Sequence, residues 1–434
     1  MNSLKRFSAA LVIAAVFVGS GLPTLLRTWS GRKIPDDFLV VYDGARAMSN
    51  HVDIYAGTGG MYIYSPFLAF IFQPLAVLSE RAAAIVWLAL SGSIIFAAAI
   101  IAARTVAQRW RLSQSDFSIP WLISATALVL SFAKIRSDFT LGQTDCLILI
   151  GLVGILCWND RRPLLAGCIA GATANTKYLA LIFVPYFLIK RNFRAAIASI
   201  ISFLFFFILP AVEIGLRPIK TCAIDALAVL NKVVGEHNLI NLETAGRTAK
   251  PVVNSVTWDH SVSLTSSILR LTRAHELSDV LGATLIFILF AAILVAIVFI
   301  GRSNGVNLFR ALAAKSASRD PGTGTIEWAG LIVLALIFGP QTTARHMILL
   351  MLVYTVAMAI ILAQKRRGPQ IALISSMMAT ALALSLPFRE TGSHPSLVAL
   401  KLIGTASWCA LVLILCVVWI GSRTISSNSS FNSC

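Results

Sequence analysis

The chain has 434 residues, of which 57% are hydrophobic and only 13% are charged, and its mean hydropathy is +0.81. Soluble domains are roughly 45–50% apolar and about 25% charged, so this composition excludes an ordinary soluble protein. The net charge of +17 does not indicate nucleic-acid binding, because the basic residues form short runs between apolar segments, as in the cytoplasmic loops of membrane proteins. We therefore predict an all-α polytopic membrane protein.

Apolar segments that are long enough, or nearly long enough, to cross a bilayer recur along the chain, and a span needs roughly 20 residues. Lys5-Arg6 precede the first segment, which places the N-terminus inside. This segment could be a signal peptide, but no clear A-x-A-like site follows, so an uncleaved span is favoured. Charge alternation predicts about 12 spans in a single domain, residues 1–425. The longest apolar segments are Phe7–Leu26, Ala82–Ala103, Ala195–Leu209, Leu281–Ile300, Ile326–Gly339, Met347–Ala363, Ile371–Pro387 and Leu397–Ile420.

Several stretches between these segments have features of their own. In the first outer loop, residues about 27–81, the stretch Met61–Leu78 is predicted to be a helix at the outer surface, because the loop that follows it is basic. Two short spans, Leu164–Ala174 and Leu179–Ile189, predict a helix break at Asn175-Thr176-Lys177 that lines a cavity within the protein. Residues 134–143 and about 213–279 are predicted as outer segments, and the tail 426–434 as disordered.

This topology, chosen from charge alone, gathers the unusual polar residues at the outer face. Carboxylates are costly at a membrane unless they face water or have a function. The arrangement therefore predicts a site built from several outer loops and helix ends. Its candidate residues are Asp36, Asp37, Asp53, Gln143, Asp145, Lys177, His260, Arg345 and His346.

Each of these residues also has an ordinary structural interpretation. Asp36-Asp37 could supply a general base, or could be solvated carboxylates or a helix cap before Phe38. Lys177 could bind an anion or extend its amine to the membrane surface. Gln143 begins a segment in which Thr and Asp suit a helix start, and His346 could bind phosphate, shuttle a proton or simply lie at the interface.

Other classes of site leave no pattern in the sequence. There is no phosphate-binding Walker loop, no dinucleotide-binding glycine turn and no H-E-x-x-H zinc motif. The seven cysteines are scattered without C-x-x-C, so we expect no metal site, no disulfide framework and no cofactor. An enzyme of this shape is expected to take a lipid-carried substrate at the outer face. Arg and Lys in its outer loops suit a lipid phosphate, although most of them could be solvated surface charges.

The order of short motifs resembles glycosyltransferase family 87, membrane enzymes with the GT-C fold. The resemblance runs from about Asp36 to His346. Its later elements include a G-Q-x-N-like stretch, an A-x-x-K-like stretch and a Pro followed by His. The matching positions are Asp37-Phe38 with Tyr42, Asp53-Ile54-Tyr55, Tyr62–Leu68 with Tyr64 and with Ser65 in place of a Pro, Pro74-Leu75-Ala76, Gly142–Asp145, Ala174 with Lys177, His260-Ser261-Val262, and Pro340–His346.

This resemblance implies a sugar transferase of the bacterial inner membrane, with a cytoplasmic N-terminus and a periplasmic active site. It implies a polyprenyl-phosphate sugar donor, often mannose, a lipid or glycan acceptor, and inversion at the anomeric carbon. By analogy, Asp37, or alternatively Asp36, would act as the base. The donor phosphate would be held by Lys177, Arg345, His346 and Gln143, and the substrates would be contacted by Tyr42, Asp53, Tyr64 and His260.

Two other functions remain open at this stage. A transporter or flippase of lipid-linked glycan would share the membrane topology, but charges at mid-span and an internal repeat would be expected, and neither is seen. A catalytically inactive subunit of an envelope-glycan complex would keep the fold without a working site. The departures from the family motifs at Ser65, Asp145, Tyr178 and His260 keep that alternative open.

Overall fold

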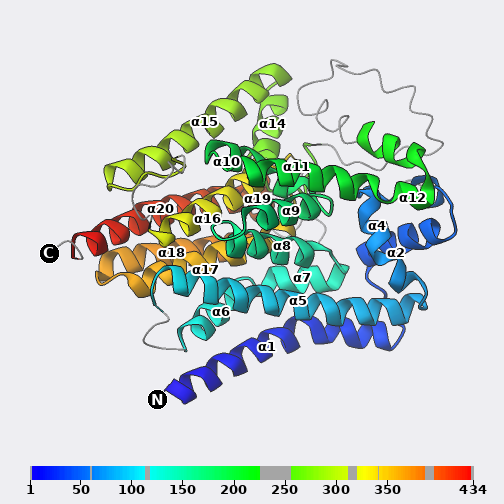
Figure 1. Ribbon diagram of the computed structural model, residues 1–434, viewed down its shortest axis with the longest axis horizontal. Helices are drawn as coiled ribbons and strands as arrows, with labels where there is room; N and C mark the ends of the chain where they lie inside the picture. The colour runs from blue at the N-terminus through cyan, green and yellow to red at the C-terminus, as the bar shows by residue number, and fades with distance from the viewer. Residues whose placement is uncertain are drawn as a thin grey trace.

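The computed structural model describes residues 2–58, 61–112, 118–224, 256–310, 320–340, 342–386 and 395–431. Within these ranges every regular element is a helix, and the only β contact is an isolated antiparallel bridge between Ser261 and Thr343. The helices form an elongated bundle with both chain termini at one end, and α2 and α4 lie at the opposite end (Figure 1).

The N-terminal half contains two long helices, α1 (Asn2–Trp29) and α5 (Glu80–Arg109), which lie side by side (Figure 1). The Ser79 side chain accepts from the Ala82 N–H and caps α5, while Arg109 in its last turn suits the negative end of the helix. The shorter helices are α2 (Asp36–Ser49), α3 (Ile54–Gly57), α4 (Pro66–Ala76), α6 (Ile119–Leu130), α7 (Phe132–Leu141), α8 (Asp145–Trp158) and α9 (Pro163–Ala174).

The chain from residue 178 onward contains the most buried and the most exposed of the candidate membrane spans. Helices α16 and α17 are almost entirely buried, whereas α15 leans away from the bundle with most of its apolar surface exposed, as suits a helix facing lipid (Figure 1). The elements are η1 (Tyr178–Ile182), α10 (Phe183–Ile189), α11 (Phe193–Ile208), α12 (Ala211–Ile214), α14 (Leu264–Ala274), α15 (Asp279–Ser303), α16 (Pro321–Phe338), η3 (His346–Leu349), α17 (Leu350–Ala363), α18 (Arg367–Leu384), α19 (Pro395–Leu402) and α20 (Thr405–Phe431).

The described residues contain 7 helices that are long and apolar enough to cross a membrane, or 8 if the bent pair α6–α7 is one span. The prediction of about 12 spans is not reached by this measure. Four further apolar helices, α4, α8, α9 and the η1–α10 pair, are only 10–17 residues long. A helix of that length rises only about 15–26 Å, so it crosses the hydrocarbon core only as part of a broken span.

Several sequence-based boundaries need correction. Most of residues 134–143, which we expect to be an outer segment, form the helix α7, which bends by 65° from α6. The expected single span Leu397–Ile420 is divided into α19 and α20 at Gly404, whose φ of 79° favours glycine. Helix α20 continues through Phe431, so residues 426–431 of the expected disordered tail are helical. Residues 225–255 of the outer segment lie outside the described ranges.

The helix break expected at Asn175-Thr176-Lys177 is confirmed, because α9 ends at Ala174 and η1 begins at Tyr178. The Asn175 side chain donates to the Gly171 carbonyl in the last turn of α9 and to the Phe203 carbonyl in α11, each at 3.0 Å. It therefore satisfies an acceptor at the helix end and ties the break to α11. The Ser65 hydroxyl, just before α4, donates to the Asn175 carbonyl. These contacts fix the position from which Lys177 projects.

Candidate active site

Asp37 lies in the first turn of α2, and its side chain meets residues from two distant parts of the chain. Its Oδ2 accepts from the Gln143 amide and from the Arg345 guanidinium. The Asp37 and Arg345 side chains are each 27% exposed, so the pair lies at the edge of the protein interior. Asp36 behaves differently: it pairs with Lys33 at 3.0 Å, and its side chain is 63% exposed. Only one of the two neighbouring carboxylates therefore joins the interior contacts.

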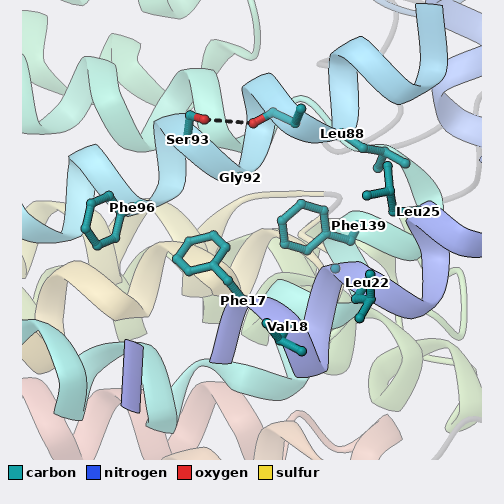
Figure 2. A pocket seen from close by; sticks show the side chains of 11 residues that line it. Phe17, Val18, Leu22, Leu25, Leu88, Gly92, Ser93, Phe96 and Phe139 are labelled. Carbon is teal, nitrogen blue, oxygen red and sulfur yellow. Dashed lines mark hydrogen bonds between the residues drawn. The ribbon is translucent and has the colours of Figure 1, made fainter. Parts of the chain in front are cut away.

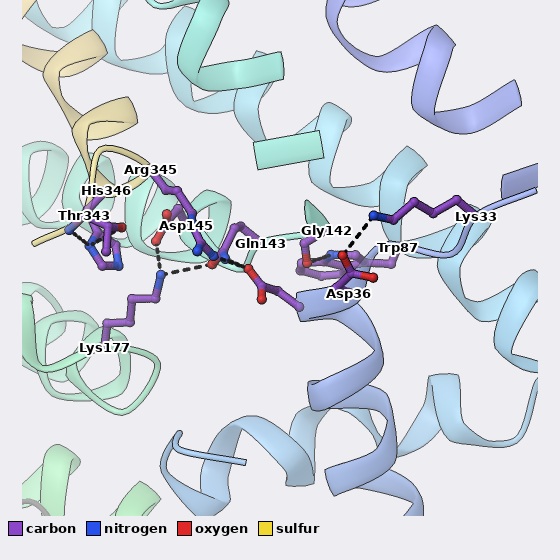
Figure 3. Close-up of polar contacts among 11 residues, drawn as sticks. Lys33, Asp36, Trp87, Gly142, Gln143, Asp145, Lys177, Thr343, Arg345 and His346 are labelled. Carbon is purple, nitrogen blue, oxygen red and sulfur yellow. Dashed lines mark hydrogen bonds and ion pairs between the residues drawn. The ribbon is translucent and has the colours of Figure 1, made fainter. Parts of the chain in front are cut away.

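Lys177 extends the same group of contacts. Its Nζ donates to Asp145 Oδ1 at 2.5 Å and to Gln143 Oε1 at 3.3 Å (Figure 3). Asp145 is completely buried at the first residue of α8, and the Lys177 side chain is 16% exposed. We call Asp37, Gln143, Asp145, Lys177 and Arg345 the polar cluster. The Gln143 amide joins its two ion pairs, because it donates to Asp37 and accepts from Lys177.

Three helical segments begin at the polar cluster. Asp145 is the first residue of α8, Lys177 immediately precedes η1, and Arg345 immediately precedes η3. The first N–H groups of a helix have no partner within it, and they give this end of the helix a partial positive charge. The helix starts therefore add to the cationic character that Lys177 and Arg345 supply. This combination of charges suits an anionic ligand.

The pKa of Asp37 is raised above its ordinary value of 3.8. Burial is the largest cause, since it disfavours the charged carboxylate, and the neighbouring Asp36 adds to it. Arg345, Lys177 and the Gln143 hydrogen bond act in the opposite direction. A carboxylate with a raised pKa is a stronger proton acceptor, as long as it remains ionised at the working pH.

His346 and Tyr64 lie beside the polar cluster. The His346 Nδ1 accepts from the Thr343 N–H at 3.1 Å, so a neutral ring carries its proton on Nε2 (Figure 3). The segment before His346 is held by the bridge between Thr343 and Ser261. Burial raises the pKa of the Tyr64 phenol, and the carboxylates of Asp37 and Asp145 raise it further, so this ring lies within electrostatic reach of both.

The three other residues expected at the site make contacts of their own. The Tyr42 hydroxyl donates to the Leu78 carbonyl at 2.7 Å and ties α2 to the end of α4. Asp53 Oδ1 accepts from the Tyr55 N–H at 2.9 Å, at the start of α3. The His260 ring stacks on Trp258, with ring centres 4.5 Å apart, and its Nδ1 lies 2.8 Å from Asp259. These contacts stabilise α2, α3 and the loop around Trp258, and none of them includes a residue of the polar cluster.

Sequence reasoning missed Asp138. This residue of α7 is only 1% exposed, and neither of its carboxylate oxygens has a hydrogen-bond partner among the described residues. The second oxygen of Asp145 is in the same condition. The available signal was an acidic residue five positions before Gln143, but Lys134, Arg136 and Ser137 beside it give the segment the composition of a polar loop. Within the described ranges no group of three or more His, Cys, Asp or Glu side chains is arranged to hold a metal ion.

Comparison with known proteins matches the model of glycosyltransferase family 87 to residues 62–318, more than half of the chain. The match includes Gln143, Asp145 and Lys177, while Asp37 precedes it and Arg345 follows it.

A polyprenol-phosphate-mannose-dependent alpha-(1-2)-phosphatidylinositol mannoside mannosyltransferase of Mycobacterium tuberculosis is 29% identical over 151 residues. That alignment covers 33% of this chain and 34% of the relative, so the similarity spans about a third of each protein. No solved structure matches significantly. On the strength of the family match, this multi-pass membrane protein belongs to glycosyltransferase family 87.

Proposed function

We propose that the protein transfers a sugar, with mannose as the first candidate, from a polyprenyl-phosphate donor to a hydroxyl of a lipid or glycan. Membership of family 87 supports glycosyl transfer, and the mycobacterial relative is named for a polyprenol-phosphate-mannose donor. The reaction inverts the anomeric carbon and takes place at the periplasmic face of the inner membrane. Lys5-Arg6 favour a cytoplasmic N-terminus. Helices α2 and α4 lie at the end of the bundle opposite both termini, which supports a periplasmic position for the site (Figure 1).

One observation carries the proposal: a single carboxylate, Asp37, is in direct contact with a cationic group that suits a phosphate. Arg345 presents several N–H donors in a planar fork, and Lys177 is a compact point charge, so both are suited to phosphate oxygens. Arg345 can bind an anion through donors that Asp37 does not use. Gln143 separates Asp37 from Lys177, so a sugar bound between these two residues would have the base on one side and the leaving phosphate on the other.

The chemistry requires one bond to form and one to break at the anomeric carbon. The acceptor hydroxyl attacks this carbon while Asp37 takes the hydroxyl proton. The bond from the anomeric carbon to the phosphate oxygen breaks, and the electron pair leaves with the phosphate. Negative charge therefore grows on the phosphate, where Lys177, Arg345 and the Nε2–H of His346 stabilise it. Gln143 fixes the positions of Asp37 and Lys177 relative to each other, because it is hydrogen-bonded to both. Tyr64 contacts the sugar.

The contacts of the other expected residues favour supporting roles. Tyr42 anchors α2 to α4, Asp53 caps α3, and His260 packs on Trp258 in the loop that pairs with the segment before His346. We therefore assign substrate contact to Tyr64 rather than to these three residues. Asp36 is too far into solvent to share the interior contacts of Asp37.

The test compares Asp37→Asn with Asp36→Asn in full-length protein in lipid nanodiscs. The donor is radiolabelled polyprenyl-phosphate mannose, the acceptor is a membrane-lipid extract, and label in new glycolipid is measured. Because general-base catalysis contributes roughly 10²–10⁴-fold, Asp37→Asn should lose most of that factor. Asp36→Asn should keep the wild-type rate. Full activity in Asp37→Asn, or no transfer from any polyprenyl-phosphate sugar by folded wild type, would contradict the proposal.

A further inference from the structure

A cavity of about 420 Å³ lies between α1 and α5, with α7 behind it (Figure 2). Five residues of α1, five of α5 and Phe139 of α7 line it. The Ser93 hydroxyl is the one polar side chain in this lining, and it donates to the Ala89 carbonyl within α5 at 2.9 Å (Figure 2). The lining therefore leaves no unused side-chain donor for a ligand and suits a hydrocarbon chain.

The shape of this groove comes from glycines and aromatic rings. A Cβ atom on Gly21 would lie 3.4 Å from the Phe139 ring, and one on Gly92 would lie 3.3 Å from it. The Phe17 ring meets the Phe96 ring edge-on, with centres 5.9 Å apart. The groove follows α1 from residue 17 to 25 and α5 from 88 to 96, which corresponds to about 12 Å at 1.5 Å per residue.

The groove opens sideways, toward the region that lipid would occupy. Helices α1 and α5 are both candidate membrane spans, and Val18 and Leu22 beside the opening are 56% and 41% exposed. Any bilayer lipid could lie against such a surface, so the lining alone does not identify the occupant. The residues at the end of the groove indicate which kind of lipid it binds.

Three exposed arginines, Arg27, Arg32 and Arg81, lie at the end of α1 and the start of α5. A Cβ on Gly31 would collide with the Arg81 guanidinium, so Arg81 lies against the loop that follows α1. Leu25 of the groove is only two residues before Arg27. Within the described part of the chain none of the three arginines forms an ion pair with a carboxylate. This basic rim suits the phosphate of an anionic lipid whose chain lies in the groove.

The groove is linked indirectly to the contacts of the proposed base, through α5 and the segment Gly142-Gln143. Leu88 of the groove follows Trp87, whose indole N–H donates to the Gly142 carbonyl at 3.1 Å. Figure 3 shows Trp87, Gly142 and Asp36 at one side of the contacts, with Lys177 and His346 at the other. An acceptor whose head group reaches Asp37 from the Trp87 side would attack the sugar on the face opposite the leaving phosphate, as in-line displacement requires.

We propose that the α1–α5 groove holds the hydrocarbon chain of the acceptor, and that the acceptor is an anionic lipid bound at its head group by Arg27, Arg32 and Arg81. This inference rests on the proposed function, since it assigns the acceptor of the same reaction. It selects the lipid among the lipid and glycan acceptors left open above. The donor chain would leave the site from the Lys177 side.

The first experiment measures binding without turnover. Full-length protein in phosphatidylcholine nanodiscs receives phosphatidylglycerol with a photoreactive diazirine in one acyl chain, and labelled peptides are mapped. We expect labelling of α1 and α5. Ala89→Trp fills the groove and should lower this labelling about tenfold, since about two methylene groups of buried chain are lost. Leu90→Trp, on the neighbouring exposed position outside the lining, is the matched control and should label like wild type.

Three results of this experiment would overturn the inference. Equal labelling by a phosphatidylcholine probe of the same chain would identify ordinary bilayer lipid. Loss of labelling on addition of polyprenyl phosphate would assign the groove to the donor chain. Unchanged labelling in Ala89→Trp would place the probe elsewhere. Replacement of Arg27, Arg32 and Arg81 together by Gln should weaken labelling by the anionic probe alone.

The second experiment uses the transfer reaction. Ala89→Trp should raise the KM for the lipid acceptor and leave the KM for the polyprenyl-phosphate donor unchanged, whereas Leu90→Trp should change neither. A rise in the donor KM alone would overturn the assignment. If folded wild-type protein transfers no sugar, the proposed function fails, and the labelling results still decide whether the groove binds an anionic lipid.

Discussion

Two buried lysine–carboxylate pairs in the described part of the protein differ in what else surrounds the carboxylate. In the polar cluster, Lys177 Nζ lies 2.5 Å from Asp145. Between α10 and α16, Lys190 Nζ lies 2.6 Å from Glu327, with the two side chains 3% and 0% exposed. By distance and burial alone the two pairs are nearly equivalent.

The Glu327 carboxylate has a protein donor on each oxygen. Its Oε1 accepts from Lys190 and from the Phe309 N–H at 2.5 Å, and its Oε2 accepts from the Tyr186 hydroxyl at 3.0 Å. Lys190 also donates to the Arg310 carbonyl at 3.1 Å. A network in which every group is satisfied holds α10, α16 and the segment at 309–310 together. Nothing in it is left to bind a ligand.

The polar cluster keeps unused capacity. One oxygen of Asp145 and both oxygens of Asp138 lack partners among the described residues, and Lys177 and Arg345 stay partly exposed. Buried acceptors without partners cost stability, so their presence beside two cations is better explained by a site than by packing. Unused hydrogen-bonding capacity, rather than burial or ion pairing, therefore distinguishes the candidate site from the Lys190–Glu327 pair, which only stabilises the packing of helices.

The largest expected effect is on stability at the satisfied pair. Lys190→Met leaves the buried Glu327 charge uncompensated and should lower the free energy of unfolding by about 3–5 kcal/mol. Denaturation of the purified protein in detergent measures this loss. The double variant Lys190→Met with Glu327→Gln removes the unpaired charge and should recover part of the stability. The activity of the folded fraction should stay at the wild-type level, and a large fall in its kcat would break the comparison.

The next largest effect is on turnover at the polar cluster. Lys177→Gln removes a cation from the leaving phosphate and should lower kcat roughly 10²–10³-fold, the usual loss for one group that stabilises transition-state charge. Adding Asp145→Asn to this variant removes the carboxylate that Lys177 had paired, so stability should recover while kcat stays low. Recovery of kcat in the double variant would show that Lys177 acts only through folding.

A smaller effect should appear in the pH dependence of kcat/KM. Asp37 must be ionised to accept a proton, so activity should fall as the pH drops through its pKa, which burial raises above 3.8. Gln143→Leu removes a hydrogen bond that lowers this pKa, so the acid limb should move to higher pH. Gln370→Leu removes a distant amide that bonds the Ile361 and Gln364 carbonyls and should leave the limb in place. If the acid limb of the kcat/KM profile does not move in Gln143→Leu, that limb reports the titration of a group other than Asp37.

The sequence was informative about the fold class and about several residues of the polar cluster. The apolar segments identified the membrane helices. The motif residues Asp37, Gln143, Lys177 and Arg345 lie together. The span count was less predictable, because helices of 10–17 residues fall below the length that marks a span.

The sequence did not predict side-chain direction or the bends between helices. Asp138 is buried because α7 turns by 65° from α6, and nothing local in the sequence announces that bend. On α2, Phe38, Val41 and Tyr42 define the buried face, and Asp36 points to solvent beside an inward Asp37. At 100° per residue, Asp37 and Tyr42 lie about 140° apart, so a motif that names both does not place both at one site.

The smallest effect tests this last distinction between anchoring and substrate contact. Tyr42→Phe removes the hydroxyl that donates to the Leu78 carbonyl at 2.7 Å, and the ring remains to pack against Phe38. The loss of one buried hydrogen bond should cost about 1 kcal/mol of stability. The KM for donor and acceptor should not change. Tyr64→Phe is the matched comparison, since its phenol lies within electrostatic reach of Asp37 and Asp145, and it should raise KM or lower kcat. A changed KM in Tyr42→Phe would indicate that Tyr42 contacts a substrate. It would also contradict the inference that the buried face of α2 serves only packing.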